Sequence, residues 1–253
     1  MKNTLPIACL VGAGLILAGC AGNSERRYPR TQIDRALSTA QYTAQPSLVV
    51  AREIEFARAA REDGQWTAFR AFATDDAVLH GRNGPVPARP VLATLEDPEK
   101  AVQWSPRTVM MSCDGRMAVS TGRFREPDGL VGDFVTVWER DGFDDEYEWS
   151  YDAGGLDDPQ PAPEEVDEDA IVVTAYDAVQ GLVADCPKAG ETIPAPVRTV
   201  MPRTESKSFL SPDKTLLWEW FHFPDGRKAV RASYWKEGDW QLIVNRRLNA
   251  SED

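Results

Sequence analysis

The chain has 253 residues and is acidic, with 40 Asp and Glu against 28 Lys and Arg, a net charge of −12 with neutral histidines. This charge argues against nucleic acid as a partner, because phosphate backbones are bound by Lys and Arg. It also disfavours attachment to anionic lipid headgroups through a basic patch. The length suits one large domain or two small ones.

The first residues are typical of a secretory signal. Lys2 precedes an apolar run over residues 5–18, which is too short to span a bilayer as a helix. The run ends in Leu17-Ala18-Gly19-Cys20, which resembles the lipobox of bacterial lipoproteins, where the cysteine is lipidated and becomes the mature N-terminus. An ordinary secretory signal with an incidental cysteine is the alternative.

The lipoprotein resemblance implies a location. Residues 1–19 would be removed, and acyl chains such as palmitate on Cys20 would anchor the protein in the cell envelope, on the periplasmic side. Two or more chains anchor a protein stably. The residue after the cysteine is Ala21 and not the Asp that retains some lipoproteins in the inner membrane, so the resemblance points to the outer membrane.

Two cysteines remain in the folded part, Cys113 and Cys186. In an oxidising compartment such a pair predicts a disulfide. Buried free thiols are the alternative.

The chain begins with helices. Residues 20–46 are polar with few large apolar groups, which predicts a tether. From residue 47, Val50, Ile54, Ala57 and Ala60 recur at helical spacing and predict an amphipathic helix that Gly64 ends. A second short helix follows over residues 66–73. The pattern then predicts an extended segment at residues 78–80 and a loop rich in glycine and proline at residues 81–90. It predicts a third small helix at residues 90–95.

Beyond Trp104 the apolar period changes to two, which predicts an antiparallel meander. We expect its strands near residues 109–113, 117–124, 134–138 and 147–151. Residues 156–169 combine prolines with carboxylates and predict a linker. A calcium-binding loop is the alternative, but the ordered Asp-x-Asp-x-Asp-Gly spacing is missing. The region 170–250 is expected to be β-rich, with strands near residues 171–176, 216–223, 229–236 and 240–246 and a loop-rich stretch after the first.

One motif occurs twice. Phe124-x-x-Pro127-Asp128-Gly129 is followed nine residues later by Trp138, and Phe221-x-x-Pro224-Asp225-Gly226 is followed nine residues later by Trp235. Duplication of a hairpin and convergence on a common turn both explain the pattern.

Residues 47–155 resemble the nuclear-transport-factor-2-like superfamily, in particular its SnoaL-like and ketosteroid-isomerase-like members. The resemblance is carried by residues 53–60, 66–69, 72–78, 120–122, 135–138 and 147–154. It implies an α+β fold in which N-terminal helices pack in a curved antiparallel sheet, a cone-shaped barrel with one apolar pocket, followed here by a smaller C-terminal β-meander. It also implies a homodimer formed through the sheet.

An enzyme of this type needs a base and a hydrogen-bond donor in the pocket. His80 and Asp152 are the candidates; a histidine in a loop and a solvated strand end are the alternatives. Asp152 is expected to share one strand face with Glu148 and Ser150, opposite the face with Tyr147, Trp149 and Tyr151. We predict that aromatic side chains line the pocket, namely Trp138, Tyr147, Trp149 and Tyr151.

The site is expected to act with its own side chains alone. No motif for a nucleotide, a serine nucleophile or a metal occurs, so the sequence predicts neither cofactor nor metal. The leading hypothesis is a non-catalytic envelope lipoprotein, with a pocket domain that binds a small apolar or amphipathic ligand or a partner protein. An isomerase- or dehydratase-like enzyme and a structural envelope protein are the alternatives.

Overall fold

A computed structural model describes residues 44–162, 178–188 and 190–250, all of which belong to one compact unit, Thr39–Asp253. The expected signal peptide, Cys20, the tether up to residue 43 and the strand near residues 171–176 lie outside the described residues. Among the described helices, none combines the length and the apolar character that crossing a membrane requires.

Three helices occur in the described part of the chain: α2 (Pro46–Glu62), α3 (Gln65–Ala71) and α4 (Ala88–Leu92). Proline suits the first turn of α2, because its missing N–H would have no partner there. At the start of α3, the carboxylate of Asp97 accepts the backbone N–H groups of Trp66 and Thr67 at 2.6 and 3.0 Å. Asp97 thus caps a helix that is too short to be stable alone.

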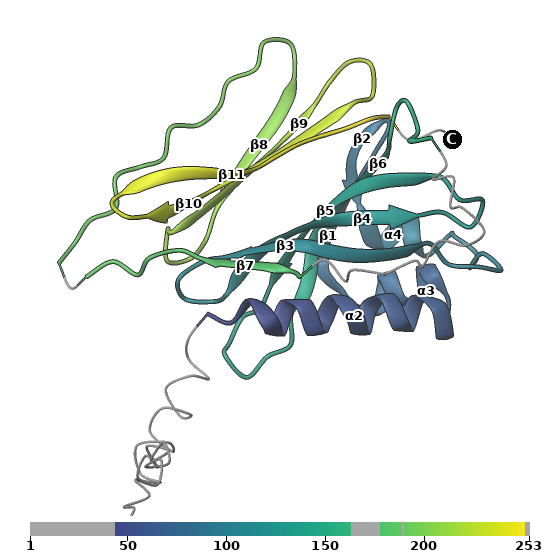
Figure 1. Ribbon diagram of the computed structural model, residues 1–253, viewed down its shortest axis with the longest axis horizontal. Helices are drawn as coiled ribbons and strands as arrows, with labels where there is room; N and C mark the ends of the chain where they lie inside the picture. The colour runs from purple at the N-terminus through teal and green to yellow at the C-terminus, as the bar shows by residue number, and fades with distance from the viewer. Residues whose placement is uncertain (1–43, 163–177, 189, 251–253) are drawn as a thin grey trace, which may run out of the picture. The chain divides into compact units, whose positions relative to one another are not determined.

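The strands of the described residues form two sheets (Figure 1). The seven-stranded sheet has the order β2-β1-β6-β5-β4-β3-β7, and the four-stranded sheet has the order β11-β10-β9-β8. The pairs β1–β6 and β3–β7 are parallel, and every other pair is antiparallel. The strands are β1 (Ala73–Gly81), β2 (Gly84–Pro87), β3 (Gln103–Met111), β4 (Met117–Arg125), β5 (Val131–Glu139), β6 (Glu148–Leu156), β7 (Gln180–Val183), β8 (Glu205–Leu210), β9 (Leu216–His222), β10 (Lys228–Lys236) and β11 (Asp239–Leu248).

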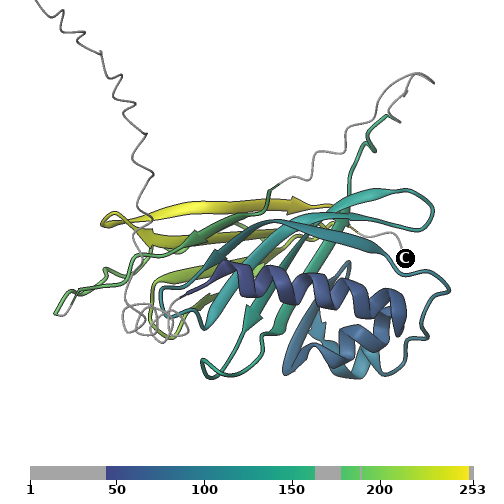
Figure 2. The same cartoon turned by 60° about the horizontal axis from the view of Figure 1, so that its bottom comes forward.

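The seven-stranded sheet is covered on both faces (Figure 2). On one face the helices and the sheet form a core that contains Phe56, Phe72, Trp138 and Trp149. On the other face the four-stranded sheet packs against the first, and the shared core includes Tyr151. The chain's own C-terminal sheet thus covers this second face.

The predicted fold class is wrong. Strands make up 45% and helices 15% of the structure, and the larger sheet is mixed instead of antiparallel. The helices do not sit inside a cone-shaped barrel, because the larger sheet is open, with β2 and β7 at its edges. The physical reason is that the C-terminal strands and β7 join the same fold, so that the chain becomes a layered, mainly β structure.

The individual elements were predicted unevenly. The first helix, the strands β4, β5, β9 and β10, and the two turns that contain Pro-Asp-Gly are confirmed. In both turns the glycine has a positive φ, 96° at Gly129 and 82° at Gly226. Three strands were missed. β2 lies in the stretch predicted as a loop, and β7 and β8 lie in the proline-rich region before β9.

A disulfide joins Cys113 and Cys186, whose Cα atoms are 5.1 Å apart. It links the turn after β3 to the segment after β7. The backbone N–H of Cys113 also donates to the hydroxyl of Thr215, in the turn between β8 and β9, at 2.9 Å. The bridge therefore lies where the two sheets meet.

Replacing both cysteines with alanine should destabilise the protein. Because the bridge closes a loop with a sequence separation of 73 residues, we expect the free energy of unfolding to fall by about 2–5 kcal/mol. Urea unfolding of the oxidised protein and the double variant measures the difference. Equal stability, with a reductant having no effect on the wild type, would contradict the assignment.

Candidate functional site

An extra residue in β6 determines which side chains face the helices. Val137 pairs with Tyr151 and Trp138 pairs with Trp149, so Ser150 is a bulge. The bulge turns Trp149 toward the helices and Tyr151 toward the second sheet. Asp152 consequently shares the helix-facing side with its partner Thr136.

Under the helices lies a cavity of about 140 Å³, which we call the inner cavity. Its walls are mainly apolar, and Asp152 is its only charged lining residue among those that the structure describes. The volume is close to that of cavities that hold one benzene molecule, roughly 150 Å³. The lining residues are Phe56, Gln65, Phe69, Val102, Trp104, Phe124, Phe134, Thr136, Asp152 and Gly154.

Strand glycines make room for two of these rings. A Cβ at Gly122 would lie 2.6 Å from the ring of Phe134, and a Cβ at Gly132 would clash with the ring of Phe124. The rings can therefore lie along the sheet only where the facing residue has no side chain. These glycines shape the floor of the inner cavity.

Asp152 is held by one hydrogen bond and has a perturbed pKa. The hydroxyl of Thr136 donates to its Oδ2 at 2.7 Å. Burial raises the pKa of Asp152 to about 6, against the opposing effects of the Thr136 hydrogen bond and the charge of Lys228. A carboxyl group with this pKa changes its charge near neutral pH and can both accept and release a proton there.

A second carboxylate, Glu53, lies beside the inner cavity on α2. It is 1% exposed, and it accepts hydrogen bonds from the Ser120 hydroxyl and from the indole N–H groups of Trp138 at 3.0 Å and Trp104 at 3.2 Å. Burial raises the pKa of Glu53 to about 7, the hydrogen bonds lower it, and the nearby Asp152 raises it further. Glu53 does not line the inner cavity, so we assign it to holding α2 and Trp104 in place.

The four aromatic residues predicted to line the pocket do not line the inner cavity. Trp138 donates to Glu53, and Trp149 donates from its indole N–H to the carbonyl of Phe69 at 3.0 Å. Tyr147 donates to the carbonyl of Gly115. Tyr151 faces the second sheet. All four are packing residues, and the cavity walls are other aromatic side chains.

His80 is buried, but it lies apart from the inner cavity. In the parallel pair β1–β6, Leu79 is aligned with Asp152, so the next residue, His80, faces the opposite side of the sheet. There its Nδ1 is 2.7 Å from the hydroxyl of Tyr151, and its Nε2 is 3.1 Å from Nδ1 of His222. The structure therefore does not bring together His80 and Asp152, the two candidates for an acid–base pair.

The chain's two histidines form this contact between the sheets, which we call the histidine pair. Burial, and secondarily the positive charges of Lys228 and His222, lower the pKa of His80 to about 3. Lys228 is 1% exposed, and burial lowers its pKa to about 8. No group of three or more potential metal ligands occurs among the described residues. The site is suited to holding the sheets together with a neutral histidine.

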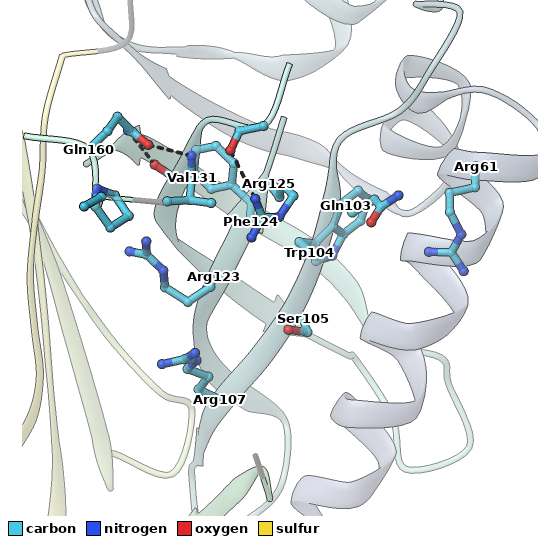
Figure 3. A pocket seen from close by; sticks show the side chains of 13 residues that line it. Arg61, Gln103, Trp104, Ser105, Arg107, Arg123, Phe124, Arg125, Val131 and Gln160 are labelled. Atoms are coloured by element: carbon cyan, nitrogen blue, oxygen red, sulfur yellow. Dashed lines mark hydrogen bonds between the residues drawn. The ribbon is translucent and has the colours of Figure 1, made fainter. Parts of the chain in front are cut away.

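A larger groove of about 990 Å³ lies next to the inner cavity (Figure 3). Trp104 and Phe124 line both. Arginine is the only charged residue type in the described lining of this groove. The four arginines are Arg61, Arg107, Arg123 and Arg125.

Sequence reasoning missed Glu53, the cavity-lining phenylalanines and the groove arginines. The predicted apolar face of the first helix contained Ile54, which is 60% exposed, whereas the buried face contains Val49, Glu53 and Phe56. Spacing alone would have allowed this face, because these residues also recur at steps of four and three. The sequence pattern did not indicate this face as buried because it contains a charged residue, Glu53.

The low pKa of His80 predicts acid-dependent stability. Its folded pKa of about 3 lies below the ordinary value of 6.5, so its contribution is present above pH 6.5 and is lost as the pH falls toward 3. Between about pH 6.5 and about pH 4.5, we expect the wild type to lose roughly 2 kcal/mol more than the His80→Gln variant. Urea unfolding as a function of pH measures both curves.

Glu53 and Asp152 titrate in the same range with the opposite sign, because their raised pKa values favour the folded state at low pH. Both carboxylates are present in both proteins, so the difference between the curves isolates His80. Parallel curves would contradict the assignment.

Compared with models of known protein families and with the sequences of curated proteins, the chain matches none. The resemblance of residues 47–155 to the nuclear-transport-factor-2-like superfamily, and that of the N-terminus to lipoproteins, therefore stay predictions. The function of the protein is therefore inferred from the inner cavity, the groove and the residues around them.

Proposed function

We propose that the protein binds a small, mainly apolar molecule in the inner cavity, with a hydrogen-bond donor of the ligand on Asp152. The single observation that carries this proposal is the Asp152 carboxyl group, the only charged group in the described lining of a mainly apolar cavity. Binding sites commonly combine apolar walls with a few polar groups that fix the ligand's orientation. A cavity of about 140 Å³ admits a single aromatic ring.

The polarity of the cavity restricts the ligand. Above pH 6 Asp152 is mainly ionised, and a carboxylate accepts hydrogen bonds but donates none. Thr136 already donates to one of its oxygens. A ligand hydroxyl or N–H would complete the hydrogen bonding, whereas a ligand carboxylate at this end would be repelled.

Phenol and benzene are a suitable pair of probes. We expect phenol to bind the full chain with an affinity that rises as the pH increases through 6, because the hydrogen bond to an ionised carboxylate is stronger. The Asp152→Asn variant should lose about tenfold in phenol affinity and lose the pH dependence, while benzene binding stays within about twofold. Ligand-observed NMR titrations measure all four affinities.

Asp133→Asn is the matched control, because Asp133 lies on the neighbouring strand and pairs with Arg123 away from the cavity. This variant should bind phenol as the wild type does. If neither probe binds, or if Asp152→Asn leaves phenol binding unchanged, the cavity is not the site proposed.

A second candidate function is proton transfer by Asp152. It is favoured by a carboxyl group with a pKa of about 6 next to a second buried carboxyl group with a pKa of about 7. Asp152 would take a proton from the carbon beside a carbonyl and return it. Cyclohexanone in D2O separates the two functions, because only an acid–base catalyst would speed deuterium incorporation and lose that activity in Asp152→Asn.

We further propose that this domain is held in the cell envelope by lipid on Cys20. The motif at residues 17–20 supports this location, and so does the disulfide between Cys113 and Cys186, since such bonds persist in oxidising compartments. A pocket domain on a tether would meet its ligand outside the cytoplasm.

Metabolic labelling with an alkyne analogue of palmitate tests the anchor. We expect the wild type and Cys9→Ser to carry the label and Cys20→Ser to lose it, because Cys9 lies inside the segment that would be removed. Two or more acyl chains also predict that wild-type protein stays with membranes after a salt wash. Label retained in Cys20→Ser would refute the anchor.

A further inference from the structure

The inner cavity and the groove adjoin at two shared lining residues, and we call the two together the depression. Trp104 on β3 and Phe124 on β4 pair across their strands and line both spaces. A molecule seated against Asp152 therefore has its other end beside the groove. The character of the groove determines which chemical group that end should carry.

Two guanidinium groups in the groove are available for a ligand. Arg61 is exposed on the last turn of α2, and no described carboxylate forms an ion pair with it. Arg125 is exposed at the end of β4; it donates one hydrogen bond to the carbonyl of Gly129 at 3.2 Å and has no described carboxylate partner. In Figure 3 they lie on either side of Trp104.

The other two groove arginines, Arg123 and Arg107, already have partners. Arg123 pairs with Asp133 at 3.1 Å and with Asp157, so its charge is already balanced. Arg107 also has an interaction of its own. Arg61 and Arg125 therefore place positive charge in the groove of a chain whose net charge is −12.

The depression therefore has a defined polarity. At its inner end Asp152 repels anions and accepts hydrogen bonds, and at its outer end two arginines attract anions. Trp104 and Phe124 provide apolar contact between the ends. A ligand that satisfies both ends must be apolar in the middle, with a donor at one end and a negative charge at the other.

We propose that the ligand is an amphipathic carboxylate, with an apolar body the size of an aromatic ring, a hydroxyl or N–H donor that binds Asp152 and a carboxylate that is attracted by the positive charges of Arg61 and Arg125. This inference rests on the proposed function and names its ligand class. Guanidinium groups suit carboxylates, because their N–H groups match both oxygens.

The test uses the full chain and two probes that differ only in charge, 3-(4-hydroxyphenyl)propionate and its neutral amide. We expect the acid to bind about tenfold more tightly than the amide at low salt. High salt should reduce this preference, because the arginines are exposed. In the double variant Arg61→Ala, Arg125→Ala the preference should disappear, while the amide binds as it does to the wild type.

Arg58→Ala is the matched control. Arg58 is exposed on the same helix, pairs with Glu62 at 4.0 Å and does not line the groove, so its removal should keep the preference for the acid. Equal affinity of acid and amide, or a preference that survives the double variant, would overturn the ligand class and leave the cavity proposal standing. Failure of both probes to bind the wild type would overturn both proposals.

Discussion

The position of Asp152 depends on one extra residue in a strand. Side chains alternate along a strand, so without the bulge at Ser150 the residues after it would exchange faces. Tyr151 would then point at the helices, and Asp152 would point at the second sheet, among apolar residues and beside Lys228. The bulge is thus the local feature that separates two buried polar sites, one under the helices and one between the sheets.

The two sheets resemble each other beyond their shared Pro-Asp-Gly turns. Strands β3–β6 and β8–β11 run in the same order, and each first turn contains a serine that donates to an aspartate, Ser112 to Asp114 and Ser211 to Asp213, both at 2.6 Å. These turns also touch, because the backbone N–H of Asp114 donates to Asp213 at 2.8 Å. The two four-stranded meanders thus share their strand order and the hydrogen bonding of their first turns, and they pack face to face.

Sequence patterns predicted the elements that depend on local alternation and missed those that depend on contacts. The strands β4, β5, β9 and β10 have clear apolar alternation and Pro-Asp-Gly turns, and they were found. β7 has four residues and owes its existence to parallel pairing with β3, which no local pattern encodes. At the site, Asp152 lies in the wall of the inner cavity, whereas His80 contacts His222 across 142 residues. The apolar periodicity of a sequence gives no information about contacts between residues that are so far apart in the chain.

The disulfide has a consequence for how the layers of this protein come together. Cys186 lies between the two meanders, and its bond to Cys113 fastens the connecting segment to the turn where they meet. If the sheets separate, the disulfide shortens the chain that connects them, so the second sheet stays closer to the face it packs against than the peptide chain alone would hold it. Short flexible linkers give one linked part an effective concentration on the order of millimolar at the other. The covalent bond thereby favours the chain's own second sheet over any outside strand that could compete for the same exposed apolar face.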